Sequence, residues 1–211
     1  GVVRILDGAT CEQLYTVGDV LNGCNPPALA DLDADGRAEI VVVTGWGQLQ
    51  AYSYDLANDQ WSLAFAGHYS DNSPVVWGSV HPTGWAALSI HDLDDDGAPE
   101  ILSGGLVYDN EGLLLDSSLG LTGRMYSGAG YPVAADLDGD GVVELATGEG
   151  VYEFDVNAQG WVAEWTGGPY QGYVAVADFG TYGSDPADDD RLVRDGVAEV
   201  ALIGSGWARI M

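Results

Sequence analysis

Asp31-Leu-Asp-Ala-Asp-Gly-Arg-Ala-Glu39 is an acidic stretch that occurs three times in this chain with little change. The other copies are Asp92-Leu-Asp-Asp-Asp-Gly-Ala-Pro-Glu100 and Asp136-Leu-Asp-Gly-Asp-Gly-Val-Val-Glu144. Carboxylates at positions 1, 3 and 5 can direct several oxygens at one hard cation, and glycine at position 6 permits the sharp turn that closes a loop around it. Glutamate at position 9 can add one or two further oxygens. The repetition therefore predicts three calcium-binding loops.

The predicted side-chain ligands occupy the same four positions of each loop: Asp31, Asp33, Asp35 and Glu39; Asp92, Asp94, Asp96 and Glu100; Asp136, Asp138, Asp140 and Glu144. An EF-hand would need a bidentate Glu at position 12 and a helix on each side. Position 12 is instead Val42, Ser103 and Thr147, and a short β-type run follows each loop. The loops are therefore expected between strands. Ordinary solvated Asp and Gly turns are the alternative, but they do not explain the recurring Glu.

Bulk composition is that of a globular protein. The chain has 211 residues, of which 46% are hydrophobic, enough for a sizeable core. No apolar run approaches the roughly 18 residues of a membrane span, and no targeting leader follows Gly1. We therefore expect a mature or excised piece without a membrane span.

The formal charge of −27 comes from 33 acidic and 6 basic residues, and all six basic residues are Arg. Such a surface repels phosphates and anionic lipids, which excludes nucleic acid as a partner. A halophile could be this acidic, but 12 of the 33 acids are the predicted loop ligands. Without metal the clustered carboxylates repel one another, so stability is expected to depend on calcium.

The two cysteines, Cys11 and Cys24, enclose a short segment that contains two glycines. This spacing, together with the oxidising and calcium-rich compartment expected for such loops, predicts a local disulfide. The alternative is a pair of buried thiols that pack as small apolar residues.

Each loop belongs to a longer repeat, whose first Asp recurs at intervals of 61, 44 and 42 residues. A period in the low forties matches a four-stranded propeller blade of ~40–50 residues, and the runs are too short and rich in Gly for helices. The predicted fold is all-β: a β-propeller of four-stranded antiparallel blades with calcium loops between first and second strands. It is expected to be a partial ring or a fragment of a larger propeller. The predicted divisions are a half blade 1–25, blades 26–86, 87–130 and 131–172, and a partial blade 173–211.

A degenerate fourth loop begins at Asp178 and resumes, after a polar insertion, at Asp195-Gly-Val-Ala-Glu199. Asp178, Asp195 and Glu199 would supply positions 1, 5 and 9. A fourth calcium site is left open.

Partner contacts are expected in loops. The first repeat has extra residues at 67–84, and long loops on rigid scaffolds often carry function. Trp46, Trp77 and Trp85 lie beside glycines in predicted loops, and His81 lies in the extra segment. These four are the candidates for a glycan or protein contact.

The repeats resemble the FG-GAP or VCBS-type family, whose blades also form the heads of integrin alpha subunits. The resemblance rests on Ala30-Asp-Leu-Asp-Ala-Asp-Gly-Arg-Ala-Glu-Ile-Val-Val42, on residues 135–146 and on Phe179-Gly180, and it covers nearly the whole chain. It implies propeller blades with one Ca²⁺ in each loop, bound through positions 1, 3, 5, 7 and 9. The position-7 carbonyls would then come from Arg37, Ala98, Val142 and, in the fourth loop, Val197.

Two functions follow from this resemblance. The first is a secreted or cell-surface module that binds a protein or glycan, with calcium in a structural role; the chain is expected to continue into further blades or domains. The alternative is a segment of an extracellular calcium-dependent carbohydrate-active enzyme, a polysaccharide lyase or hydrolase. A lyase needs a base for the proton next to a uronate and cations that stabilise the resulting anion. The candidates for these roles are His68, His81, His91, Arg124 and Tyr126. No phosphate-binding glycine loop, nucleophile elbow or zinc motif is present, and no catalytic residue is assigned.

Overall fold

A computed structural model describes residues 1–18, 21, 23, 25–76, 88–119, 132–166, 173–178, 196–204 and 207–210. The chain forms two compact units, Gly1–Met125 and Tyr126–Met211. All the secondary-structure elements named within the described residues are β-strands. In this part of the chain there is no helix of the length and hydropathy needed to cross a membrane.

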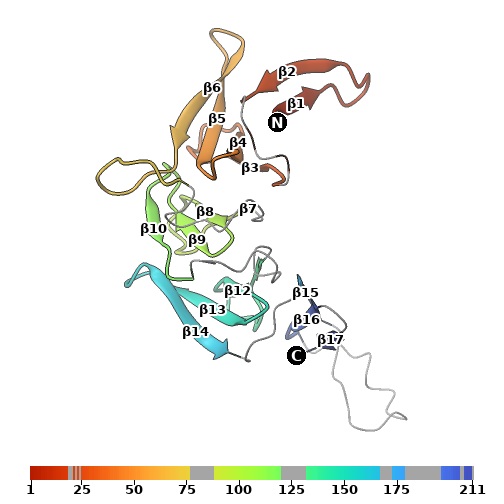
Figure 1. Cartoon of the computed structure of the whole chain (residues 1–211), viewed down its shortest axis with the longest axis vertical. Helices are drawn as coiled ribbons and strands as arrows, with labels where there is room; N and C mark the ends of the chain where they lie inside the picture. The colour runs from red at the N-terminus through yellow and green to blue at the C-terminus, as the bar shows by residue number, and fades with distance from the viewer. Residues whose placement is uncertain are drawn as a thin grey trace. The chain divides into compact units, whose positions relative to one another are not determined.

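The first unit holds one two-stranded and two four-stranded sheets, all antiparallel (Figure 1). The two-stranded sheet is formed by β1 (Val3–Leu6) and β2 (Gln13–Val17). The next sheet consists of β3 (Ala28–Ala30), β4 (Glu39–Val43), β5 (Leu49–Asp55) and β6 (Gln60–Ala66). The third consists of β7 (Leu88–His91), β8 (Glu100–Ser103), β9 (Leu106–Tyr108) and β10 (Leu114–Asp116). In each sheet the strands follow one another in chain order.

The second unit holds a four-stranded and a three-stranded sheet, also antiparallel and in chain order (Figure 1). The four-stranded sheet consists of β11 (Val133–Ala135), β12 (Glu144–Ala146), β13 (Gly150–Asp155) and β14 (Gly160–Thr166). The three-stranded sheet consists of β15 (Tyr173–Ala177), β16 (Glu199–Gly204) and β17 (Trp207–Ile210). The prediction of an all-β chain of antiparallel four-stranded sheets is therefore confirmed. Its sheets form no closed barrel among the described residues, and the propeller arrangement stays a prediction.

Strand β4 is buried on both faces because a neighbouring sheet packs against each of them. In β4 all five residues are buried, and alternate side chains face opposite ways. Ile40 and Val42 pack against Val17 and Leu21 of the β1–β2 side. Val41 packs into a second cluster with residues of the β7–β10 sheet, such as Ile101 and Tyr108. One short apolar strand thus contributes to two cores.

The second unit repeats this packing. Leu137 and Ala146 of the β11–β14 sheet form a buried cluster with Val200 and Leu202 of β16. The first strands of successive sheets also approach each other, β3 with β7 in the first unit and β11 with β15 in the second. In each unit, therefore, two neighbouring sheets pack face to face, and the second strand of each sheet contributes residues to the buried cluster between them.

Three hairpin turns share one design. Asp7, Asp55 and Asp155 begin the turns, and each carboxylate accepts hydrogen bonds of 2.8–3.3 Å from the backbone amides two and three residues later. The residue four positions after each Asp is a non-glycine with φ between 49° and 59°, namely Cys11, Asp59 and Gln159. Since two of these turns join the third and fourth strands of complete sheets, the β1–β2 hairpin corresponds to third and fourth strands as well.

The predicted disulfide is not supported. Cys11 is an exposed free thiol at the turn of the β1–β2 hairpin, and Cys24 lies outside the described residues. Gly23, next to Cys24 in the chain, lies beside Gly1 at the other end of that hairpin. Strand β2 alone is about 16 Å long at 3.3 Å per residue, whereas a disulfide needs Cα atoms within about 7 Å.

Residues 67–76 are the described part of the extra segment 67–84, and hydrogen bonds attach them to the first unit. His68 and Leu114 are joined by a backbone hydrogen bond of 2.8 Å, and the amide of His68 bonds the carbonyl of Gly112. Val75 is fully buried in the cluster between the two four-stranded sheets. The segment is therefore anchored to the first unit at Gly67, His68 and Val75, while residues 70–74 between them are exposed.

A core prediction compares two leucines of the β3–β6 sheet. Leu49 is 0% exposed and Leu63 is 50% exposed. Leu49→Ala should lower the free energy of unfolding by about 3 kcal/mol, because it leaves a cavity between two sheets, and Leu63→Ala by less than about 1 kcal/mol. Denaturant unfolding measures both. Equal losses would show that Leu49 does not lie in a packed core.

Candidate metal centres

The structure brings carboxylates together in each of the three acidic loops, which join β3 to β4, β7 to β8 and β11 to β12. In each loop one carboxylate oxygen from each of three residues lies within 4.8 Å of the other two. The triads are Asp31, Asp33 and Glu39; Asp92, Asp94 and Asp96; Asp136, Asp138 and Glu144. Each of these clusters could hold a metal ion.

Position 1 holds the loop in its curved shape. In the first loop the Asp31 carboxylate accepts hydrogen bonds from the amides of Asp35 (3.1 Å) and Gly36 (2.9 Å). The second loop has the same pair of bonds to Asp92, at 3.2 and 3.0 Å. In the third loop the amides of Gly139 and Gly141 bond to Asp136, at 2.7 and 3.2 Å. The backbone is thus wrapped around the position-1 carboxylate.

Two residues in each loop adopt left-handed backbone conformations. At position 6 these are glycines, with φ of 87–97°, as the sequence predicted. At position 4 they are Ala34 and Asp95, both with φ of 57°, and Gly139 with φ of 81°. L-residues rarely adopt this region, and a non-glycine residue there costs about 1 kcal/mol. Two such turns in three residues fold positions 1, 3 and 5 towards one point.

The position-9 carboxylates are buried. Glu39, Glu100 and Glu144 are 4%, 7% and 2% exposed, and each accepts a hydrogen bond from the amide of the leucine at position 2 of its loop. Burial raises the pKa of all three, and that of Glu100 reaches about 7, although the leucine amide opposes the shift. The neighbouring aspartates raise these pKa values further. A bound cation would neutralise this charge.

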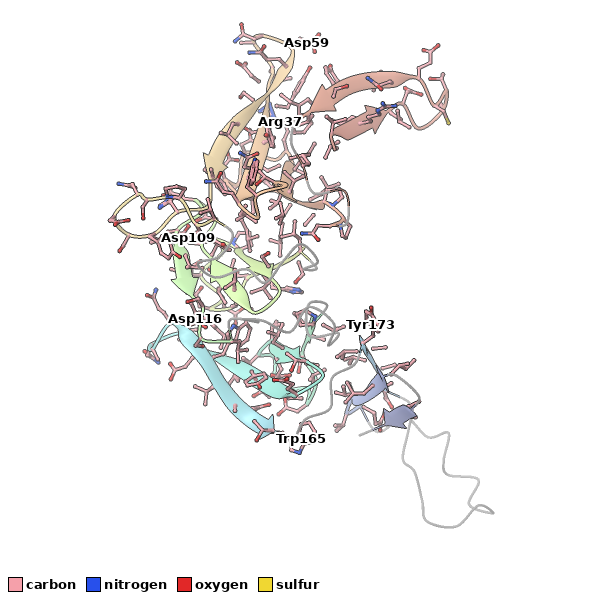
Figure 2. The ribbon with its side chains drawn as sticks, in the orientation of Figure 1. Arg37, Asp59, Asp109, Asp116, Trp165 and Tyr173 are labelled. Atoms are coloured by element: carbon pink, nitrogen blue, oxygen red, sulfur yellow. The ribbon has the colours of Figure 1, made fainter. Side chains whose placement is uncertain are left out.

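Arg37 forms an ion pair with the position-5 carboxylate of its own loop. Its Nη2 lies 3.1 Å from Asp35 Oδ2, and both side chains are about 40% exposed. An exposed pair of this kind contributes about 0–1 kcal/mol. Arg37 is labelled in Figure 2. Its carbonyl, like those of Ala98 and Val142, is the predicted position-7 ligand, and these three remain predictions.

The fourth loop keeps one feature of the others. The amide of Gly196, at position 6, donates to Asp178 Oδ2 at 3.2 Å, as position 6 bonds to position 1 elsewhere. Gly196 also has a left-handed φ of 87°. Glu199 begins β16, and Val197 is 49% exposed. The predicted ligand Asp195 lies outside the described residues, so the fourth site stays open.

The other predicted contact residues fall mostly outside the described residues, where Trp77, His81 and Trp85 lie. Trp46 is described: it lies in the β4–β5 turn and is 71% exposed. His91 ends β7 and is half-buried, and burial lowers its pKa. His68 Nδ1 is 2.9 Å from the carbonyl oxygen of Tyr69.

Sequence reasoning missed a polar cluster on the β1–β2 and β5–β6 hairpins. The hydroxyls of Tyr15 and Tyr54 both donate to Asp59 Oδ1, the first at 2.7 Å, and the Tyr54 ring lies 5.6 Å from that of Trp61. Figure 2 shows Asp59 at the tip of the β5–β6 hairpin. No local pattern could have revealed the cluster, because Tyr15 lies 44 residues before Asp59.

The leucines at position 2 also have a role that the sequence analysis did not assign. The carbonyl of Leu32 accepts a hydrogen bond of 2.9 Å from Asn110, in the β9–β10 turn of the next sheet. The carbonyl of Leu137 accepts one of 2.8 Å from the amide of Ala198, in the fourth loop. The recurring Leu gave no signal of these bonds, because they use the backbone carbonyl; the leucine side chains pack in the hydrophobic clusters. These bonds link an acidic loop to the following sheet in each unit.

Comparison with known proteins shows the fold and no family. No protein-family profile matches the chain, and no curated protein sequence matches it. Solved structures do match. The V. cholerae biofilm matrix protein Bap1 matches with a TM-score of 0.59 and 20% identity, over 100% of this chain and 31% of Bap1.

Two rhamnogalacturonan lyases match as well. The Bacillus licheniformis enzyme has a TM-score of 0.57 and 20% identity, and the lyase YesW has 0.59 and 19%. Each match covers 99% of this chain and 35% of the enzyme. The chain thus shares its fold with parts of three larger proteins and spans about a third of their length.

A pH prediction follows from the raised pKa of Glu100. Between about pH 4.5 and 7 the metal-free native protein holds a proton on this carboxyl that the unfolded chain has released, so its stability should fall as pH rises through this range. Glu39 and Glu144 act in the same direction. Thermal unfolding in a chelator at pH 5 and pH 7.5 should therefore give the higher melting temperature at pH 5.

Glu100→Gln is the control. Because its amide side chain is neutral at both pH values, the variant should show a smaller difference in melting temperature between pH 5 and pH 7.5 than the wild-type chain. Calcium should reverse the trend, since protons must leave the carboxylates before the metal binds. A metal-free protein that becomes more stable from pH 5 to 7.5 would contradict the assigned burial of these glutamates.

Proposed function

We propose that this chain is part of an extracellular calcium-binding β-propeller that serves as a protein- or glycan-interaction module, with calcium in a structural role. The observation that carries the proposal is the repeated loop: three times, between the first and second strands of a four-stranded sheet, three carboxylates converge within 4.8 Å. The loop backbone holds the converging oxygens in the same way each time. A calcium ion at each loop would tie two strands of a sheet together.

Calcium suits the donor set better than other common metals. All the converging side-chain donors are carboxylate oxygens. Ca²⁺ takes six to eight oxygen ligands in a flexible geometry, and Mg²⁺ prefers near-ideal octahedral sites with several waters. Zinc prefers His and Cys, which the three clusters lack. The ligands assigned to each ion are positions 1, 3, 5, 7 and 9 of its loop.

The propeller and the FG-GAP or VCBS-type repeat are part of the same proposal. Support comes from the sheets themselves: each is an antiparallel meander, successive sheets pack face to face within a unit, and first strands approach first strands. Blades around a common axis have these properties. Residues 26–86, 87–130 and 131–172 would each form one blade, with parts of two further blades at residues 1–25 and 173–211.

The interaction role is proposed from the fold and the surface. A biofilm matrix protein and two rhamnogalacturonan lyases share the fold, and the two lyases are named for a polysaccharide substrate. Fold alone does not determine function. Trp46, 71% exposed in a turn, offers a ring on which a sugar or an apolar side chain could stack.

An enzyme segment is the second candidate, because two of the matched structures are lyases. A histidine that serves as the base of a lyase must be neutral at the working pH in order to accept the proton beside a uronate. His91 meets that requirement, since burial lowers its pKa. No other described group supports catalysis, so the interaction module is preferred.

Calorimetric titration with Ca²⁺ tests the metal sites. The wild-type chain should bind at least three ions, and its melting temperature should rise by several °C between a chelator and millimolar Ca²⁺. Asp94→Asn should remove one site or weaken it at least about tenfold, because position 3 is a ligand. Asp95→Asn is the matched control: it removes the same charge from the adjacent residue, which is not a ligand, and should leave affinity nearly unchanged. Equal effects of the two changes would contradict the ligand assignment.

Glycan binding is tested with rhamnogalacturonan as the first probe. Trp46→Ala should weaken binding roughly tenfold through loss of ring stacking, without a change in melting temperature. Leu56→Ala, which removes an apolar side chain that is 67% exposed in another turn, should leave binding unchanged. Affinity electrophoresis measures both. Unsaturated products in the same incubations, lost in His91→Ala, would favour the enzyme over the interaction module.

A further inference from the structure

One sheet of the first unit has half the strands of its neighbours. The β1–β2 hairpin corresponds to the third and fourth strands of a complete sheet, because its turn matches those of β5–β6 and β13–β14. In the complete sheets the third strand pairs on one edge with the second strand and on the other with the fourth. Within the described residues, β1 pairs as a strand only with β2, so its other edge is open.

A pocket of about 540 Å³ lies at β1. Its walls include Val2 and Val3 on one side and Val42 and Val43 of β4 on another, and Pro26 and Pro27 also line it. Val2 is 42% exposed. The pocket therefore joins an open strand edge to the apolar face of the next sheet.

The neighbouring interface shows what covers this position in a complete sheet. Where β3–β6 meets β7–β10, the core contains Ala28 and Ala30 of the first strand and Val41 of the second, besides residues of the third. Where β1–β2 meets β3–β6, the sheet with β1 contributes third- and fourth-strand residues such as Val3 and Val17. To become a four-stranded sheet, the β1–β2 hairpin would need a first and a second strand, and the second strand would lie beside β1.

We propose that this pocket is the docking site of a two-stranded segment of the acidic-loop type, supplied from outside residues 1–211. Its second strand would pair antiparallel with β1, as β4 pairs with β5, and the apolar side chains on one of its faces would cover Val42. Backbone hydrogen bonds at a free edge provide affinity, and alternate side chains provide selectivity. The inference rests on strand pairing and the pocket, and it holds whether or not the loops bind calcium or the chain binds a glycan.

The chain supplies its own probe. A copy of residues 26–48, which contains β3, the first acidic loop and β4, is attached directly before Gly1; since Gly1 corresponds to Leu49, this restores the natural order of strands. The melting temperature of the extended full chain should rise by at least about 5 °C. Hydrogen exchange at the amides of the β1 segment 2–4 should slow at least tenfold, as the new strand protects them.

Three variants control for unspecific stabilisation. The same extension with A28D and V41D in the added copy should give no gain, because the corresponding residues of β3 and β4 are those that pack against the following sheet. V2D in the original chain should weaken the gain. L14D, at a side chain of β2 that is 54% exposed and does not line the pocket, should not. If the extended chain fails to fold, calorimetry with a synthetic peptide of residues 26–48 replaces it, and binding weakened by V2D supports the proposal.

An unchanged melting temperature and unchanged exchange in the folded, extended chain overturn the proposal, as does equal stabilisation by the A28D/V41D extension. So does dimerisation of the original chain with protection of segment 2–4, because a second copy would then fill the pocket. Calcium titration of the same samples tests the proposed function separately: calcium binding without docking would contradict only the docking proposal, and docking without calcium binding would contradict only the proposed function.

Discussion

The hydrogen bond between the position-9 glutamate and the position-2 leucine amide is the contact on which each sheet depends. In the first loop it joins Glu39 to Leu32 at 2.8 Å. Glu39 is also the first residue of β4 and pairs with Ala30, the last residue of β3. Closing the loop therefore sets the register of the first two strands, and a slip by one residue would turn Val41 away from its core. The contact requires a buried carboxylate, which is the least favourable group in the sheet.

Most of the local structure could be predicted from the sequence because its determinants lie within nine consecutive residues. The Asp spacing and the Gly at position 6 identified the loops, and the apolar run after Glu39 identified a strand. The convergence of three carboxylates in each loop follows from the same short pattern. Whether those oxygens bind calcium is a question of affinity, and the ligand set therefore remains a prediction.

Contacts between distant residues could not be predicted in this way. The Cys11–Cys24 disulfide was inferred from spacing, which carries no information on the direction of the hairpin that separates the two positions. The bond from Asn110 to Leu32 spans 78 residues and depends on how two sheets pack. The left-handed residues at position 4, including Ala34, were missed because alanine gives no sign of that conformation. The first two cases depend on tertiary packing, and the third on a local backbone conformation that the side chain does not encode.

In each unit a bond joins a loop carbonyl of one sheet to the sheet that follows it. Asn110 donates to Leu32 in the first unit, and the amide of Ala198 donates to Leu137 in the second. Both partners of each bond lie within one pair of successive sheets. A gene that duplicates such a pair would therefore carry the bond with it, so that chains of this kind can lengthen in evolution by pairs of sheets that already fit together.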